Sequence, residues 1–381
     1  MLTERYARKI NAQKQAGLHR NPLVIDHKEG RFVSIGHKKL LNFSSNDYLG
    51  LSGSEEIARI VAENFVRYGT SAGASRLVSG NSRALKDAEQ AYAQAFGYED
   101  ALFFPSGFQA NIGILSTLFG PGDHLLFDKH IHASSIKGMQ LSNADWKGYN
   151  HSSLAHLEKR LQAGQGQQQA VVTESLFSMD GDLLDVTGLA ALKKEYAFFC
   201  LVDEAHAVGV LGDQGLGIAG SVADIAVGTF GKAFGLFGAF VLLPKICKEY
   251  LMNFCAPLIY TTTLPEAHAA SAGAILKIVM RCDDKRETLK DRSLLMKRLV
   301  QEKGFPVTGD AHILAIEIGE EKKAVTLSRR LYDRNIYVFP ARYPTVPLGK
   351  AILRIGMTAL HTEEDIRFFA DALADEIERI A

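Results

Sequence analysis

The architecture of this chain follows from two stretches, Phe198–Gly209 (FFCLVDEAHAVG) and Asp224–Gly235 (DIAVGTFGKAFG). Each begins with an apolar run of strand length and continues into a turn that contains polar residues and glycine. Runs that are apolar on both faces, with helical patterns between them, are typical of a mostly parallel sheet covered by helices on both sides. Asp203 and Lys232 therefore each follow a strand at its carboxyl end, where open α/β sheets bind their ligands.

The same alternation of apolar runs and helical patterns extends on both sides of these stretches. Further strands are predicted at residues 101–105, 124–128, 170–176 and 237–243, helices at 265–304, and a small α+β domain after Gly304. Short β-like pieces occupy residues 31–50, and residues 1–20 read as a polar helix or arm. The predicted class is α/β, divided into an N-terminal segment 1–50, a large domain 51–280 and a small C-terminal α+β domain 281–381.

Composition narrows the classes of function. The 381 residues hold 43 Lys+Arg and 43 Asp+Glu, so no single-sign field is expected to attract nucleic acid or a membrane surface. The four cysteines form no CxxC pair, which is typical of a reducing compartment and argues against a zinc site or disulfide framework. The first residues lack an apolar signal region and no run of 18 apolar residues occurs, so a cytoplasmic protein without membrane spans is expected.

Lys232 and Asp203 together indicate a cofactor. Pyridoxal phosphate needs a lysine amine for a Schiff base and a carboxylate that keeps its ring nitrogen protonated. Taken singly, each residue has an ordinary interpretation: a surface lysine in a glycine-rich turn, and an aspartate that caps a helix. Their places after two strands of one sheet favour the cofactor.

Candidates for the phosphate of that cofactor follow other strands. Phe103–Asn111 (FFPSGFQAN) is a strand, a turn and a helix start, in which Ser106, Gly107 and Phe108 precede free helix N–H groups that bind phosphate. By itself this is also an ordinary turn between a strand and a helix. Ser178 and Thr229 offer hydroxyls after the strands at 170–176 and 224–229, although Ser178 also suits a turn or cap.

Two histidines and an arginine complete the candidate residues. The flat ring of His132 suits stacking on the cofactor and polarising a substrate carbonyl. His130 and His132 form an HxH pair, but no third ligand of compatible spacing is evident, so no metal is predicted. His206 is placed to donate to the phenolic oxygen of the cofactor. Arg354 lies within an apolar strand and needs an anionic partner, which is either a substrate carboxylate or an internal salt bridge.

Two other motifs are excluded by their context. Asp203–His206 spells a DEAH box, but the glycine and hydroxyl positions of a phosphate-binding P-loop are alanines, Ala226 and Ala233, around Lys232. Gly215–Gly220 (GLGIAG) matches GxGxxG, but it does not directly follow a strand and has no acidic residue about twenty positions on. It is predicted to be a glycine-rich loop near the active site.

With these residues identified, residues 20–380 resemble the pyridoxal-phosphate-dependent α-oxoamine synthase family, whose fold is that of the aspartate aminotransferases, fold type I. The resemblance rests on a set of motifs in order: Asn42–Ser52 (NFSSNDYLGLS), Ser75–Gly80 (SRLVSG), Phe104–Asn111, Asp203–Gly209, Gly228–Gly235, Tyr260–Thr263 and Pro344–Pro347 (PTVP). It implies a decarboxylative condensation of a small amino acid, such as L-alanine, with an acyl-CoA or acyl-carrier-protein thioester. Which acyl chain is used, and whether the amino acid is alanine, glycine or serine, stays open, as does a non-catalytic subunit that retained the fold.

The resemblance also implies roles for single residues. Lys232 is the Schiff-base lysine, Asp203 pairs with the pyridine nitrogen, His206 contacts the phenolic oxygen and His132 stacks on the ring. The phosphate end of the cofactor is surrounded by Ser106, Gly107, Phe108, Ser178 and Thr229. The substrate is bound by Asn46 and Arg354, with Arg20 in the remnant of a basic cluster. Thr262 reaches the phosphate of the neighbouring subunit, so a homodimer is implied.

Overall fold

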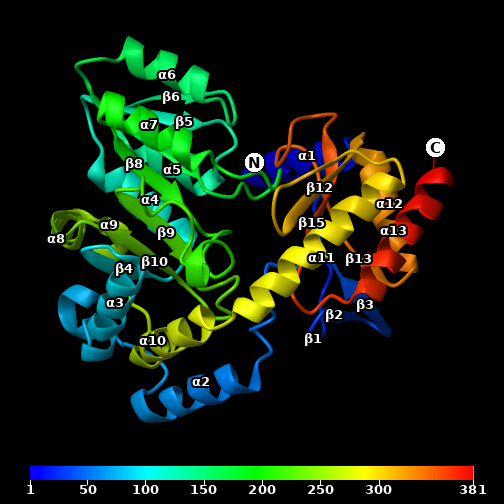
Figure 1. Ribbon diagram of the computed structural model, residues 1–381, viewed down its shortest axis with the longest axis horizontal. Helices are drawn as coiled ribbons and strands as arrows, with labels where there is room; N and C mark the ends of the chain where they lie inside the picture. Colours follow the sequence, from blue (N-terminus) through cyan, green and yellow to red (C-terminus); the bar gives the residue numbers. More distant parts are fainter. Residues whose placement is uncertain (381) are drawn as a thin grey trace. The chain divides into compact units, whose positions relative to one another are not determined.

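The computed structural model describes residues 1–380, which form two compact units (Figure 1). The larger unit contains residues 51–178 and 183–286, and the smaller unit contains residues 1–50, 179–182 and 287–381. The N-terminal segment and the C-terminal segment thus belong to one unit, and the division of the chain into three domains stays a prediction.

The larger unit is built on a seven-stranded sheet. Its strands, in spatial order, are β4 (Asp100–Phe104), β10 (Ala239–Leu243), β9 (Ile225–Thr229), β8 (Phe199–Asp203), β7 (Gln168–Glu174), β5 (Asp123–Asp128) and β6 (Asp145–Tyr149). Only β10 is antiparallel to its neighbours. The mostly parallel sheet is therefore confirmed. The edge strand β6 was not predicted, because its residues DWKGY are mostly exposed and carry no apolar run.

Helices cover both faces of this sheet because the strands are apolar on both faces. The helices of this unit are α2 (Glu55–Tyr68), α3 (Arg83–Phe96), α4 (Gly107–Leu118), α5 (Ala133–Ser142), α6 (Leu154–Ala163), α7 (Val186–Tyr196), α8 (Lys245–Phe254), α9 (Ala256–Ile259) and α10 (Glu266–Met280), with short turns η1 (Arg76–Gly80) and η2 (Asp213–Gly215). Of these, α2 packs against α10. Leu102 and Phe104 of β4 pack with Ile114 of α4 on one face. Phe103, between them, contacts Tyr92 of α3 on the other face.

Parallel strands place their carboxyl ends at one edge of the sheet. Glu174 at the end of β7 is the direct neighbour of Asp203 at the end of β8. Thr229 ends β9, the next strand along, and Asp128 ends β5 on the other side. Polar residues that are far apart in the sequence are thereby collected at this edge.

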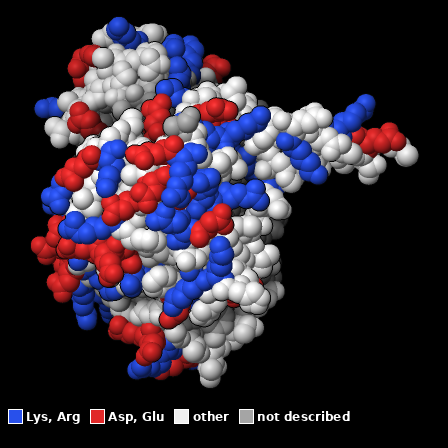
Figure 2. All heavy atoms as spheres, turned by 90° about the vertical axis from the view of Figure 1, so that its right-hand side faces the viewer, with Lys and Arg blue, Asp and Glu red and all other residues white. Residues whose placement is uncertain are grey.

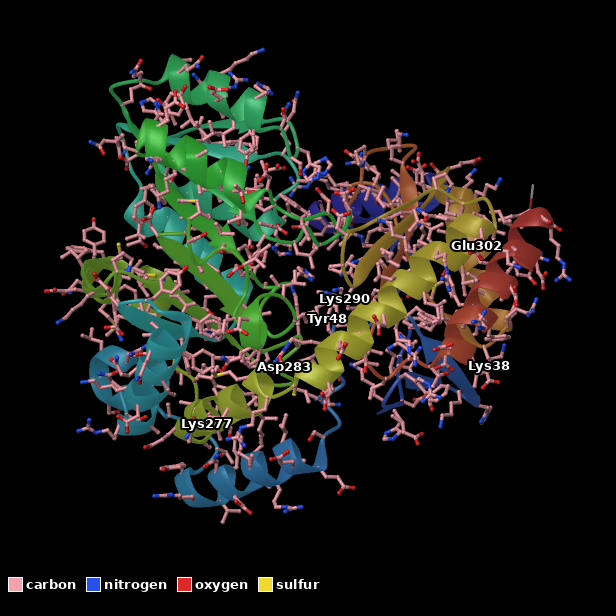
Figure 3. The ribbon with its side chains drawn as sticks, in the orientation of Figure 1. Lys38, Tyr48, Lys277, Asp283, Lys290 and Glu302 are labelled. Atoms are coloured by element: carbon pink, nitrogen blue, oxygen red, sulfur yellow. The ribbon has the colours of Figure 1, made fainter. Side chains whose placement is uncertain are left out.

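The smaller unit contains two four-stranded sheets. One has the order β1 (His27–Glu29), β2 (Phe32–Ile35), β3 (Lys38–Asn42) and β13 (Ile336–Tyr337), and the other has β11 (Val307–Thr308), β12 (Ile313–Gly319), β15 (Ala351–Gly356) and β14 (Phe339–Ala341). Its helices are α1 (Leu2–Gln15), α12 (Glu321–Asp333), α13 (Glu363–Glu378) and most of α11 (Asp283–Glu302). Asp283, Lys290 and Glu302 mark α11 in Figure 3. The parallel pairing of β13 with β3, through Ile336 and Leu41, ties the two ends of the chain together.

Charged side chains of both signs are interspersed over the face shown in Figure 2, consistent with the equal numbers of acidic and basic residues. Among the helices of residues 1–380, none combines the length and the apolar character that crossing a bilayer requires.

Candidate active site

Asp203 is a buried carboxylate held by two neutral donors. Its Oδ2 accepts from the side-chain amide of Asn111 at 2.8 Å, and its Oδ1 accepts from the backbone N–H of Ala205 at 2.9 Å. Within residues 1–380 no side chain forms an ion pair with it. A buried charge is normally paired, so this carboxylate fits a cationic partner such as a protonated ring nitrogen.

Lys232 lies in the turn of residues 230–238 that connects β9 and β10. The turn is closed by backbone hydrogen bonds from Phe230 to Gly238 and from Leu236 to Phe230, both 2.9 Å. The ring of Phe230 is fully buried and anchors the turn, while Lys232 itself is only half-buried. An anchored turn that carries a partly exposed lysine suits the attachment of an aldehyde cofactor.

Thr229, at the start of this turn, is engaged by the turn itself. Its hydroxyl donates to the carbonyl of Gly238 at 3.0 Å and accepts from the N–H of Gly231 at 3.1 Å. A hydroxyl has one proton, so in this conformation Thr229 has no second proton for a phosphate. Its predicted contact with the cofactor stays a prediction.

His132 is the N-cap residue of α5 and lies beside the ends of β7 and β8. Its backbone N–H donates to Glu174 at 2.5 Å, and its Nδ1 lies 2.7 Å from the hydroxyl of Ser134. Burial lowers the pKa of the ring; Asp203 opposes this change and Lys232 adds to it. Two of the residues predicted to surround the cofactor, Asp203 and Lys232, thus act electrostatically on the ring of the third, His132.

Glu174 is a functional candidate that the sequence reasoning did not identify. It is almost fully buried, and its pKa is raised well above the ordinary value by burial and by the neighbouring Asp203. The N–H groups of His132 and Ser178 and the charge of Lys232 oppose that rise. The available signal was an acidic residue close to the end of a strand, since Glu174 stands two positions after the apolar run 170–172.

The start of α4 offers the expected anion site. The hydroxyl of Ser106 caps the helix by accepting from the N–H of Gln109 at 3.2 Å. A side-chain carbon added at Gly107 would meet no atom within 4 Å, so the space above the first turn is open. Phe108 is half exposed, and its ring contacts that of His132. Helix N-termini with open space and free N–H groups bind phosphate.

The remaining cofactor candidates are described by their burial and by the strand or helix next to them. His206 is buried just after β8, Ser178 is partly buried after β7, and Thr262 is exposed before α10. The rings of the predicted HxH pair have different partners, since His130 stacks on His151 at 3.9 Å whereas His132 contacts Ser134.

The substrate candidates belong to the smaller unit. Arg354 lies in the middle of β15 and is only 6% exposed, and its Nη2 donates to Oδ1 of Asn46 at 3.2 Å. The same Asn46 oxygen accepts from the hydroxyl of Tyr48 at 3.1 Å (Tyr48 is labelled in Figure 3). Burial raises the pKa of Tyr48 to about 12, and Arg354 opposes the rise. The structure thus brings Arg354 and Asn46 together, whereas the exposed Arg20 bonds to Thr345 at 3.5 Å.

Comparison with known proteins gives a consistent picture. Residues 38–373 match the family model of aminotransferase class I and II. The chain is 38% identical to the 8-amino-7-oxononanoate synthase of Haemophilus ducreyi, over 95% of this chain and 97% of that protein. It is 37% identical to the enzyme of that name from Geobacter sulfurreducens, over 98% of both.

Solved structures show the same fold. The serine palmitoyltransferase of Sphingomonas wittichii superposes with a TM-score of 0.92 at 28% identity, covering 97% of both chains. A serine palmitoyltransferase of S. paucimobilis, with PLP and myriocin bound, gives 0.92 at 27% identity, covering 98% of this chain and 97% of that one. The 8-amino-7-oxononanoate synthase of Francisella tularensis gives 0.78 at 31% identity, covering 90% and 98%. The predicted fold type is confirmed, and the chain belongs to the aminotransferase class I and II family, among the relatives of the 8-amino-7-oxononanoate synthases.

Proposed function

We propose that this protein is a pyridoxal-phosphate-dependent acyltransferase that condenses L-alanine with a pimeloyl thioester. The products are 8-amino-7-oxononanoate, carbon dioxide and the free thiol carrier, in the synthesis of biotin. The proposal is carried by two features in a chain 37–38% identical to synthases of this name. One is the buried carboxylate of Asp203, which has no ion-pair partner among residues 1–380, and the other is the anchored turn of Lys232 after the neighbouring strand.

The residues of the site fit the cofactor. Lys232 supplies the amine that binds its aldehyde carbon, Asp203 balances the charge of its ring nitrogen, and the start of α4 at Gly107 receives its phosphate. We further assign Ser106, Phe108, Ser178 and Thr229 to the phosphate end, His206 to the phenolic oxygen and, in a homodimer, Thr262 to the phosphate of the partner subunit. When bound, pyridoxal phosphate supplies an electron sink for a carbanion at the substrate α-carbon.

The chain's own residues then do the rest of the chemistry. The amine of Lys232 removes the proton from the α-carbon and returns one after carbon dioxide has left. His132, with a ring beside Asp203 and Lys232, is placed to donate to the thioester carbonyl oxygen as negative charge develops on it. Arg354, with Asn46, binds the carboxylate of the amino acid, because a guanidinium pairs with a carboxylate through two parallel hydrogen bonds.

Sequence identity favours this reaction over that of a serine palmitoyltransferase. Identity to the solved serine palmitoyltransferases is 27–28%, against 37–38% to the curated synthases. The proposal covers CoA and a carrier protein as alternative thiol carriers. It also includes a homodimer and a cytoplasmic location.

The test is a substrate screen on the purified protein with its cofactor. The cofactor absorbance is recorded with L-alanine, glycine and L-serine, and pimeloyl-CoA, palmitoyl-CoA or acetyl-CoA is then added while thiol release and product mass are followed. We expect turnover only with L-alanine and the pimeloyl thioester. Borohydride reduction should place the cofactor on Lys232, with the other lysines of the peptide map as internal controls. Turnover of L-serine with palmitoyl-CoA instead, or a label on another lysine, contradicts the proposal.

A further inference from the structure

We propose that Asn111 and Ser134 form a hydrogen-bonded link that holds the ring of His132 in its neutral Nε2–H form, at a set position relative to Asp203. Both are positioning residues, since they act through His132 and Asp203. Neither has a role among the residues assigned above, although both are fully buried at the carboxyl edge of the sheet. The catalytic consequence rests on the proposed function, but the protonated nitrogen is a property of the chain itself.

The direction of each hydrogen bond follows from Asn111. Its Nδ2 lies 2.8 Å from Oδ2 of Asp203 and 3.0 Å from Oγ of Ser134. A carboxylate oxygen only accepts, so the amide must turn its NH2 group, and not its oxygen, toward Asp203. The two protons of that group then go to Asp203 and to Ser134. The hydroxyl oxygen of Ser134 therefore accepts at this end.

The hydrogen bond from Asn111 also fixes the direction of the hydrogen bond between Ser134 and His132. Having accepted from Asn111, it has its single proton left to donate, and Nδ1 of His132 lies 2.7 Å away. The backbone N–H of Ser134 points at the same Nδ1 from 3.3 Å. A backbone N–H and a protonated Nδ1 repel each other because both are donors, so this longer contact supports the direction that the shorter hydroxyl contact sets. Nδ1 is therefore the acceptor, and the ring proton is on Nε2.

The backbone of His132 is held from the other side. Its N–H donates to Oε1 of Glu174, the residue paired with Asp203 across β7 and β8. His132 is thus fixed through its ring and its main chain to two strands that end at the same edge. Nε2–H remains as the one polar group of the ring outside this link, and it is a donor. That is the form that stabilises negative charge on a carbonyl oxygen.

The charged and titratable groups that act on His132 come from three elements. They are Glu174 at the end of β7, Asp203 at the end of β8 and Lys232 after β9. The hydroxyl of Ser134 adds a hydrogen bond to the uncharged ring nitrogen, which favours the neutral ring. Its removal should make protonation of His132 easier.

The experiment is long-range 1H–15N NMR of the cofactor-loaded protein with 15N-labelled histidine, with the His132 signals assigned by their absence in His132→Gln. In the wild type we expect a proton on Nε2 and none on Nδ1. In Ser134→Ala we expect a mixture of tautomers and a His132 pKa higher by about half to one unit. Asn111→Leu should shift both readouts in the same direction by less. With the proposed substrates, kcat of Ser134→Ala should fall about tenfold while KM for L-alanine changes less than twofold.

The matched control is Ser142→Ala, on the same helix. Its hydroxyl is equally buried and donates to the carbonyl of Met139 at 2.8 Å. This variant should lose comparable stability without any change in the His132 signals. A wild-type His132 protonated on Nδ1, or a tautomer unchanged in Ser134→Ala, overturns the link. Absence of turnover with L-alanine and the pimeloyl thioesters of both CoA and a carrier protein overturns the proposed function alone, because the NMR readout does not depend on the substrate.

Discussion

Glu204 is expected to make the stability of the larger unit depend on pH. It follows Asp203 directly, is almost fully buried, and accepts through Oε1 from the N–H groups of Ile218 and Ala219 at 2.8 and 3.0 Å. These hydrogen bonds hold the glycine-rich loop that includes Gly217 against Glu204. Burial raises its pKa from 4.5 to about 7, and the two N–H bonds oppose that rise.

The sign of the effect follows from proton binding. The folded protein binds this proton more tightly than the unfolded chain does. The stabilisation is therefore fully present below pH 4.5 and is lost as the pH rises through 7. At about 1.4 kcal/mol per pKa unit, keeping Glu204 ionised in the folded state costs about 3 kcal/mol at pH 8. Most of that cost appears between pH 5 and pH 8.

The perturbation is Glu204→Gln, which keeps an oxygen that accepts from Ile218 and Ala219 but cannot ionise. Relative to the wild type, the free energy of unfolding of this variant should rise by about 2–3 kcal/mol between pH 5 and pH 8. Urea unfolding followed by tryptophan fluorescence suits the measurement, because the chain has one tryptophan, Trp146, and it lies on β6 of the same unit. The cofactor is kept at the same saturating concentration throughout.

The control is Glu63→Gln, an exposed residue on α2 of the same unit. It measures the general effect of replacing one glutamate of this unit by glutamine at a surface position. If the difference between Glu204→Gln and the wild type also stays constant from pH 5 to pH 8, or falls, then Glu204 is ionised in the folded protein over the whole range and the reasoning from burial is wrong.

Two other substitutions test the substrate site and a buried ion pair. Arg354→Ala should weaken L-alanine binding about tenfold or more, which is measured as a smaller change in cofactor absorbance. Arg354→Lys should recover only part of the lost affinity, because lysine lacks the planar fork of a guanidinium. Unchanged L-alanine binding in a folded variant would mean that Arg354 has a structural role. Glu89→Ala removes the carboxylate that accepts from Arg76 at 2.5 and 3.0 Å, where the two side chains are 0% and 3% exposed. Leaving the buried Arg76 without this carboxylate should lower the free energy of unfolding, measured with urea, by about 3–5 kcal/mol. A decrease below about 1 kcal/mol would show that Arg76 finds another partner.

The sequence was sufficient for elements whose signal is local. The apolar runs at 101–105, 124–128, 170–176, 198–202, 224–229 and 237–243 are strands in the structure to within two residues at each end. Residues 265–304 form the two helices α10 and α11, and the chain after Gly304 contains both strands, such as β12 and β15, and helices, α12 and α13. The edge strand β6 and the two-residue strand β13 were missed, because an exposed or very short strand needs only a partner for its backbone and shows no apolar pattern.

Among the candidate active-site residues, too, some positions follow from the local sequence and others depend on tertiary contacts. Asp203 and Lys232 each stand directly after or just beyond an apolar run, so their positions at the carboxyl edge of a parallel sheet follow from the order of the chain. The contacts of Asn111 do not, since it meets Asp203 across 92 residues and Ser134 across 23. Those contacts depend on which strands are neighbours and on how α4 lies against them.

The sequence by itself therefore determined the α/β class and indicated the cofactor, because periodicity and strand-end position are properties of neighbouring residues. That Asp203 and Lys232 form the site of this cofactor stays a prediction. Tertiary structure alone decided that residues 1–50 share a compact unit with 287–381. It also decided the proton position on His132 and the raised pKa values of Glu174 and Glu204. Burial and hydrogen-bond direction depend on atoms brought together from distant parts of the chain, and no local pattern encodes them.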